Sequence, residues 1–119
     1  MTQDQNSKRY DLEERTFNFA RKVNIYVKQL PKTLPNLENG KQLIRAAGST
    51  GANYIEANEA LSKKDFIVRI KIYRKEAKES RYWLGLTEPI KDSETDKEFL
   101  IKEATEFIKI FNSILEKSK

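Results

Sequence analysis

A basic stripe runs along one stretch of the sequence, between residues 63 and 81. This stretch holds eight lysines and arginines against three acidic residues. At about 100° per residue, four of the lysines fall close to one line, opposite the apolar positions of the same stretch. These four residues, the lysine stripe, are Lys64, Lys71, Lys75 and Lys78. Positive charges spaced by about one helical turn can follow a phosphate backbone, so the stripe predicts a surface for nucleic acid.

Three further side chains extend this basic face. Arg74 and Arg81 flank the lysine stripe, and Tyr82 shares its face and offers a ring on which a base could stack. The sequence leaves two alternatives open. A lysine stripe is often only a solvated helix face, and the same charges could instead dock an acidic protein partner.

Two pairs of glutamates raise the question of a metal centre. Glu56 with Glu59, and Glu76 with Glu79, are three residues apart, the spacing found in two-metal carboxylate sites of helical bundles. Those sites also use histidine, and the chain contains neither histidine nor cysteine. We therefore predict no metal, no cofactor and no catalytic residue, and a protein that is not an enzyme. Glu56 and Glu76 are expected to pair with a lysine or arginine of a neighbouring helix.

The composition is that of one folded, water-soluble domain. The chain has 119 residues, of which 34% are charged and 38% hydrophobic, with a net charge of +5. This balance is typical of a folded protein and permits nucleic-acid binding without requiring it. No segment approaches the roughly 18 consecutive apolar residues of a membrane span. We expect a cytoplasmic protein that has no membrane partner.

Four amphipathic helices account for the apolar pattern, and no strand pattern is present. Residues 1–9 are polar and predicted to form a disordered tail, and residues 10–119 to form one helical domain. The connections between the helices are short, which favours antiparallel neighbours. The predicted fold is all-α, an antiparallel up-down four-helix bundle. The expected helices cover approximately residues 11–30, 40–60, 62–87 and 93–117.

Polar residues and a proline mark the predicted helix ends. Asp11, Ser62 and Ser93 each have an acidic residue three positions later, the pattern of a capping box. Pro31 ends the first helix, and residues 31–39 are expected to be a turn-rich linker.

The sequence contains more large apolar residues than the core of one four-helix bundle is expected to bury. Phe17 and Ile25 lie off the core side of the first helix, and Ile72 and Trp83 lie off that of the third. The fourth helix is apolar over about half of its circumference. We interpret these residues as the interface of a homo-oligomer; the alternative is one well-filled core with scattered surface apolar residues. The core positions expected on the first and third helices are Leu12, Thr16, Phe19, Val23, Tyr26, Val27 and Leu30, with Phe66, Ile70, Tyr73, Ala77 and Leu84.

Small residues cluster in the second helix. Ala47 with Gly51, and Gly48 with Ala52, are four positions apart and would let another helix approach closely. A flexible break in the helix is the rival interpretation. A phosphate-binding loop is disfavoured because no strand precedes the cluster and no Gly-Lys-Ser/Thr motif follows it.

Several segments resemble a known bacterial family of four-helix-bundle proteins. The similar segments are Tyr10-Asp11-Leu12-Glu13, Leu30-Pro31, Gly51-Ala52-Asn53-Tyr54-Ile55-Glu56-Ala57, Ser62-Lys63-Lys64-Asp65-Phe66 and Lys75-Glu76-Ala77-Lys78-Glu79-Ser80-Arg81-Tyr82-Trp83-Leu84. They resemble the proteins first noticed as a reading frame in an intervening sequence of the large ribosomal RNA gene, which are often labelled ribosomal proteins. The resemblance covers residues 10–115.

This resemblance implies a homopentamer with a barrel-like shape and a central channel. Related accessory variability determinants of diversity-generating retroelements bind a reverse transcriptase and nucleic acid through basic surfaces. The implied partners are thus further copies of the chain, RNA or other nucleic acid, and a reverse transcriptase or another protein. The family offers no catalytic residues to transfer, and nothing in this sequence places it beside a reverse transcriptase. We predict a non-enzymatic oligomer that binds RNA and assists a ribonucleoprotein, or alternatively a protein–protein scaffold.

Overall fold

The helices follow one another with short connections. The computed structural model describes residues 2–58 and 62–119, and the side chains of residues 12–52 and 62–119. A short 3-10 turn, η1, precedes the last helix, and no strand occurs in the described residues. The elements are α1 (Thr2–Lys28), α2 (Leu34–Asn58), α3 (Lys63–Leu86), η1 (Lys91–Ser93) and α4 (Glu94–Lys117).

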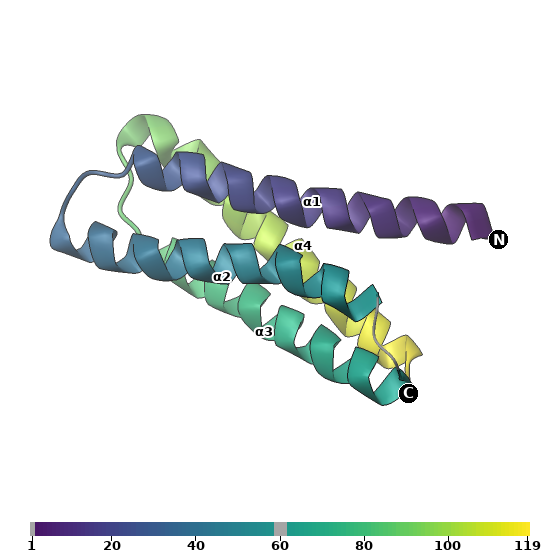
Figure 1. Cartoon of the computed structure of the whole chain (residues 1–119). Helices are drawn as coiled ribbons and strands as arrows, with labels where there is room; N and C mark the ends of the chain where they lie inside the picture. The colour runs from purple at the N-terminus through teal and green to yellow at the C-terminus, as the bar shows by residue number, and fades with distance from the viewer. Residues whose placement is uncertain (1, 59–61) are drawn as a thin grey trace.

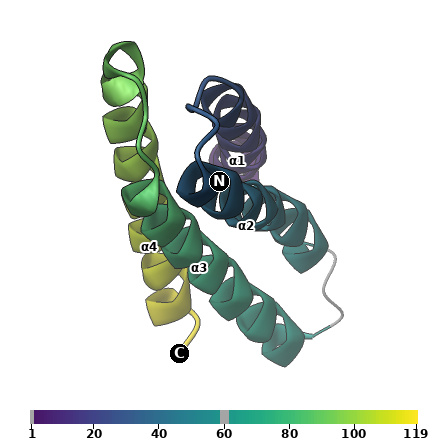
Figure 2. The ribbon, with the colours of Figure 1, turned by 90° about the vertical axis from the view of Figure 1, so that its left-hand side faces the viewer.

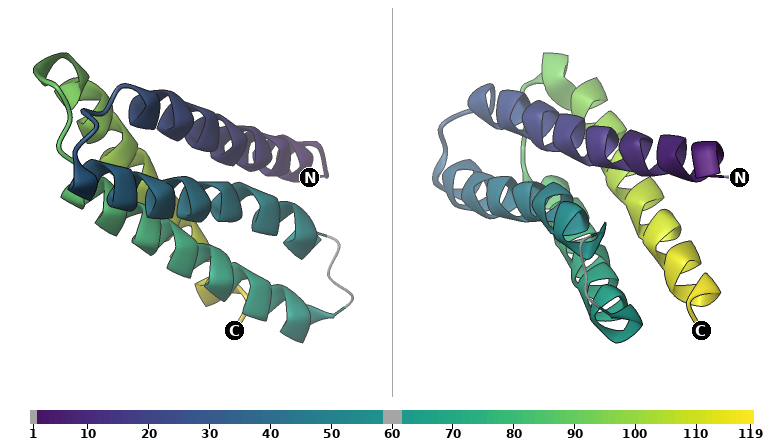
Figure 3. Two further views of the ribbon diagram at one scale, coloured as in Figure 1. Left: turned by 60° about the vertical axis from the view of Figure 1, so that its left-hand side comes forward. Right: turned by 45° about the vertical axis from the view of Figure 1, so that its right-hand side comes forward.

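Successive helices run in opposite directions (Figure 1). The bundle is elongated, with principal extents of 46 × 24 × 20 Å. Each helix packs beside the next along the chain, whereas α1 and α4 contact one another much less. Figures 2 and 3 show why. Helix α4 passes the C-terminal end of α1 and then diverges from α1 toward the N-terminal end of α1. The predicted antiparallel up-down four-helix bundle is confirmed.

The first helix begins earlier than the sequence predicts. α1 is helical from Thr2, so it continues through residues 2–9, where a disordered tail is expected, and Asp11 lies inside it. The prediction that Asp11 caps the helix is therefore wrong. No glycine or proline stands between Thr2 and Asp11 to interrupt the backbone hydrogen bonds. The domain boundary at residue 10 stays a prediction.

The second helix also begins earlier, inside the predicted linker at Leu34. Thr33 caps it, because the Asn36 N–H donates to Thr33 Oγ1 at 3.3 Å and the Leu37 N–H donates to the Thr33 carbonyl at 2.9 Å. Pro35 is tolerated because the first N–H groups of a helix have no acceptor within it. The linker prediction fails because proline is compatible with a helix start as well as with a turn.

Asn36 fixes the start of α2 to two connecting segments. Its side chain is 2% exposed. The amide nitrogen donates to the carbonyls of Pro31 at 3.0 Å and Glu88 at 2.9 Å, and the amide oxygen accepts from the Glu88 N–H at 2.9 Å. This clamp holds the α1–α2 connection against the segment after α3, at the end of the bundle where α4 begins.

The two predicted serine caps have different outcomes. Ser62 precedes α3, and its Oγ accepts a hydrogen bond from the Asp65 N–H at 3.1 Å, which confirms that cap. Ser93 precedes α4 as predicted, but its hydroxyl donates to Gln29 Oε1 at 3.2 Å and does not cap the helix. Ser93, the last residue of η1, thus joins the start of α4 to the residue that follows α1. The predicted end of the second helix near Ala60 lies outside the described residues.

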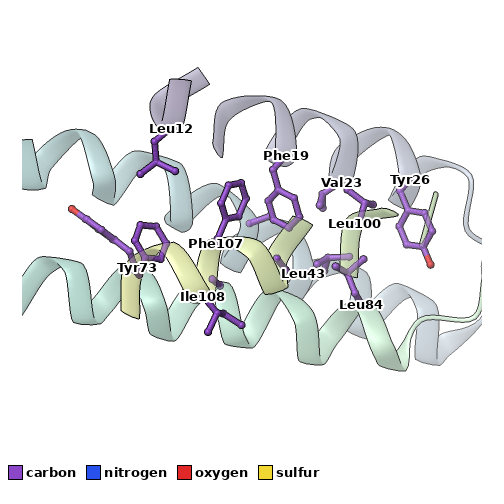
Figure 4. Packing of buried hydrophobic residues seen from close by; sticks show 14 of the residues in the cluster. Leu12, Phe19, Val23, Tyr26, Leu43, Tyr73, Leu84, Leu100, Phe107 and Ile108 are labelled. Atoms are coloured by element: carbon purple, nitrogen blue, oxygen red, sulfur yellow. The ribbon is translucent and has the colours of Figure 1, made fainter. Parts of the chain in front are cut away.

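The core lies between all four helices, and Figure 4 shows part of it. Every core position predicted on the first and third helices is buried, except Val27 and Phe66, which are partly buried. Phe19 of α1 meets Phe107 of α4 edge to face, with ring centroids 5.4 Å apart and planes at 88°. This aromatic contact and the aliphatic side chains around it supply the main stabilisation through burial.

The wide apolar face of α4 is mostly covered within one chain. Among its ten predicted apolar positions, only Phe99 is exposed. One chain thus covers most of this face, mainly through α3, and burial of the remaining apolar surface between subunits stays a prediction. The ten positions are Phe99, Leu100, Ile101, Ala104, Phe107, Ile108, Ile110, Phe111, Ile114 and Leu115.

The small residues of α2 divide into a buried and an exposed pair. A Cβ added to Gly51 would lie 3.2 Å from Thr16 Oγ1 and 3.4 Å from the Thr16 backbone carbon, so α1 approaches closely there. Ala47 is buried on the same side, whereas Gly48 and Ala52 are exposed. The close-packing prediction is confirmed for Ala47 and Gly51 within the bundle; a Cβ at Gly48 would meet nothing within 4 Å.

Candidate nucleic-acid interface

The lysine stripe lies on the outer surface of α3. All four lysines are exposed. The α3 side opposite the stripe carries the buried Ile70, Tyr73 and Ala77, so core packing itself turns the lysines outward. None of the four forms an ion pair with an acid in the part of the chain that the structure describes. Among the described side chains, the positive charge of the stripe therefore has no acidic partner.

The two glutamates of α3 point away from the lysine stripe. Arg45 of α2 reaches across to both, with nitrogen-to-oxygen distances of 3.5 Å to Glu76 and 3.3 Å to Glu79. The expected pairing of Glu76 with a basic residue is confirmed, and the side chain of Glu56 lies outside the described ones. Arg45 thus compensates the acidic charge of α3 on the side opposite α4.

Burial is the main influence on Glu76. Its side chain is 13% exposed, and this desolvation raises the pKa of the carboxyl above its ordinary value, while the charge of Arg45 acts in the opposite direction. Oε1 of Glu76 has no hydrogen-bond partner among the described residues, although Oε2 accepts from Arg45. Glu76 is thus a structural group between α2 and α3.

The two predicted arginines turn toward α4. Arg74 donates to Asn112 Oδ1 at 2.9 Å, and Arg81 donates to Thr105 Oγ1 at 3.4 Å. Both arginines therefore lie beside the stripe, on the border between α3 and α4. A guanidinium has five N–H donors, so one hydrogen bond to a neighbour leaves others available for phosphate.

A groove lies next to this border, and sequence reasoning did not find it. It holds about 490 Å³ between the first half of α3 and the end of α4. Lys71 and Arg74 line one side, and Asn112 and Lys119 line the other. The sequence pattern of α3 does not show that α4 contributes to this groove, because the two segments come together only in the folded chain.

Tyr82 stands on the same outer face as the lysines. Its side chain is 61% exposed. The ring packs edge to face against Trp83, with centroids 5.0 Å apart and planes at 80°. Trp83 itself is partly buried against the core, so it gives the exposed tyrosine a fixed support.

The four residues predicted for the oligomer interface do not form one patch of equal exposure. Phe17 is 61% exposed, Ile25 52% and Ile72 41%. The Trp83 side chain is partly buried against the core of its own chain. Its indole N–H has no hydrogen-bond partner among the described residues. Phe17 and Ile25 belong to α1, whereas Ile72 and Trp83 belong to α3, so the four residues are divided between two helices.

A second groove includes one of these interface residues. It holds about 320 Å³ between α1 and α4, and Ile25 and Phe99 both line it. Lys22 lies over the Phe99 ring, 4.6 Å from its centroid. The sequence pattern of α4 identifies Phe99 as apolar but gives no sign that it remains exposed beside Ile25.

The acidic side chains that the structure describes are not gathered into a metal centre. In the part of the chain with described side chains, no group of three or more His, Cys, Asp or Glu side chains is placed to hold a metal ion. Glu76 and Glu79, the described half of the two glutamate pairs, are held by Arg45. The feature that stands out is the lysine stripe of α3, which has no acidic partner among the described side chains.

Comparison with known proteins places this geometry in a family. The family model described as 23S rRNA-intervening sequence protein matches residues 8–113. The chain belongs to this family. The match covers all four helices, as the sequence resemblance implied. No helix in the described residues is long and apolar enough to cross a bilayer.

A solved family structure has the same fold. It is the crystal structure, at 1.70 Å resolution, of a protein of unknown function from the S23 ribosomal protein family of Bacteroides thetaiotaomicron. The two chains share 33% sequence identity with a TM-score of 0.70, over 87% of this chain and 97% of the other. No curated protein matches the chain. The family members that match thus describe the fold and leave the activity open.

Proposed function

We propose that this protein is a non-enzymatic homo-oligomer, a pentamer, that binds RNA through the basic face of α3. The residues that contact phosphates are the lysine stripe with Arg74 and Arg81 beside it. The observation that carries the proposal is the set of four exposed lysines with no acidic partner among the described residues. The two glutamates of the same helix pair instead with Arg45 of α2. Contacts to phosphate alone make the binding largely independent of sequence.

Self-association repeats this face around a symmetry axis. Exposed Phe17, Ile25 and Ile72 support it, since large apolar side chains at a surface favour contact with another protein surface. Several copies of the stripe in one particle raise the local potential and strengthen the attraction of a long polyanion. Assistance to a ribonucleoprotein or a reverse transcriptase is the biological role that such a particle would suit.

Binding of labelled RNA at two salt concentrations tests the proposal. The test variant combines Lys71→Glu with Lys75→Glu on α3. The control variant changes the net charge by the same amount at exposed lysines of α4, through Lys102→Glu and Lys109→Glu. We expect tight binding at low salt, a steep loss at higher salt, and a much larger loss for the α3 variant than for the α4 variant. No binding at low salt, or equal losses in the two variants, would reject an RNA-binding stripe.

The same variants address the scaffold alternative. If the stripe docks an acidic protein, the purified particle carries no nucleic acid and the α3 variant loses a protein partner while RNA titrations stay flat. A particle that retains nucleic acid through a high-salt wash supports the RNA proposal.

A further inference from the structure

We infer that the strand bound along α3 is single-stranded RNA and that the Tyr82 ring stacks on one of its bases. This inference rests on the proposed function and assigns a role to a residue that phosphate contacts do not use. It follows from the position, the exposure and the support of Tyr82, taken together with the lysines that precede it.

Tyr82 continues the line of the lysine stripe. Lys75, Lys78 and Tyr82 follow one another at intervals of three and four residues, so their side chains emerge from successive turns of the same face. From Lys64 to Tyr82 the line extends about 27 Å at the helical rise of about 1.5 Å per residue. A backbone held by the lysines therefore brings a nucleotide to the tyrosine ring.

The ring is available and held in place. Its side chain is 61% exposed, and the edge-to-face contact with Trp83 at 5.0 Å limits its motion. Trp83 packs partly against the core, so the support is part of the rigid bundle. A ring fixed before binding loses little conformational entropy when a base stacks on it.

Stacking selects unpaired over paired RNA. In an A-form duplex the base faces are covered by their neighbours, and a protein meets mainly phosphates and 2′-hydroxyls. An unpaired strand can turn a base outward onto an aromatic ring while its phosphates remain on the lysines. The combination of a cationic line and one supported aromatic ring therefore matches a single strand better than a duplex.

Two substitutions of Tyr82 separate stacking from charge and from bulk. Tyr82→Phe keeps the ring and removes the hydroxyl, while Tyr82→Leu keeps an apolar side chain and removes the ring. The full-length protein is titrated with a short labelled RNA strand that cannot pair with itself, and with the same strand in a duplex. The affinities are measured over a series of salt concentrations, and circular dichroism checks that each variant keeps its helices.

The expected result is a loss specific to the ring and to the single strand. Tyr82→Leu weakens binding of the single strand by about tenfold, the effect of losing one stacked base, while Tyr82→Phe binds like the wild type. The slope of log affinity against log salt stays the same in both variants, because no charge is lost. The single tryptophan of the chain, next to Tyr82, changes its fluorescence when the single strand binds.

Two outcomes overturn the inference, and they differ in what they leave standing. Equal binding of single strand and duplex, with no effect of Tyr82→Leu, rejects stacking but leaves the phosphate-binding stripe intact. Absence of binding to either RNA at low salt rejects the stripe and the inference together.

Discussion

The guanidinium of Arg45 on α2 lies 3.3 Å from a carboxylate oxygen of Glu79 on α3. The same guanidinium also contacts Glu76, so Arg45 forms ion pairs with both glutamates of α3. This arrangement places the glutamates of α3 on the side against α2 and leaves, among the described residues, an outer face of lysines without acidic partners. The basic face is thus a consequence of helix packing as much as of the lysines themselves.

Replacement of Glu76 by Gln should alter how stability depends on pH. Burial raises the pKa of Glu76 in the folded protein above its ordinary value of 4.5, so the folded state takes up this proton at a higher pH than the unfolded state. Stability from this group therefore increases as pH falls through the raised pKa toward 4.5, and decreases as pH rises through it. Urea unfolding from pH 7 down to pH 4.5 should show the wild type gaining stability relative to Glu76→Gln. A constant difference between the two proteins over this range would contradict the assignment.

Removal of the Tyr26 hydroxyl should destabilise the bundle. This hydroxyl lies 2.7 Å from Thr87 Oγ1 in a buried site, and Thr87 gives its own proton to the Leu84 carbonyl at 2.6 Å, so Tyr26 is the donor. Tyr26→Phe should lower the free energy of unfolding by about 1 kcal/mol. Tyr82→Phe, at an exposed ring, is the control and should leave the free energy unchanged. Equal effects of the two substitutions would show that the buried hydrogen bond contributes nothing.

Gly48 and Gly51, two of the three glycines of α2, should respond differently to alanine. Gly48 is exposed with open space around it, so Gly48→Ala should stabilise the protein by about 0.5–1 kcal/mol through helix propensity. At Gly51 the added Cβ meets the Thr16 backbone at 3.4 Å and its hydroxyl oxygen at 3.2 Å, which offsets that gain. Thermal unfolding of both variants measures the difference. A larger gain at Gly51 than at Gly48 would contradict the close approach of α1 to α2.

Light scattering should detect the oligomer and its dependence on exposed apolar residues. We expect the wild type at about five times the 13.9 kDa chain mass, and a smaller particle for Ile25→Asp or Ile72→Asp, because a charge buried in an interface is costly. Leu34→Asp, at a residue 70% exposed and outside the predicted interface, is the control and should keep the wild-type mass. A wild-type particle with the mass of a single chain at micromolar concentration would show that the protein does not form the proposed oligomer.

Much of the fold could be predicted because apolar periodicity carries it. The core stripes of α1 and α3 follow directly from a spacing of three and four residues, and burial of Phe19 and Ile70 agrees with it. The helix starts could not be predicted as well. Thr33 with Pro35 is compatible with a turn or a helix start, and residues 2–9 contain no residue that decides between helix and coil.

The site could be predicted only where one helix contains it. The outward position of the lysine stripe follows from the α3 pattern alone. The turning of Glu76 and Glu79 toward Arg45 depends on which helix packs beside α3, and the contribution of Asn112 depends on where α4 ends. These are contacts between residues 31 or more positions apart, for which no local pattern exists.

The salt dependence of RNA binding tests the central claim most directly. For a single strand, each phosphate contact adds about 0.7 to the steepness of log affinity against log salt. Replacement of Lys71, Lys75 and Lys78 by Gln should therefore make the slope shallower by about 2 and weaken binding at low salt, with unchanged helix content. An unchanged slope in this variant would show that the outer face of α3 does not hold the phosphates.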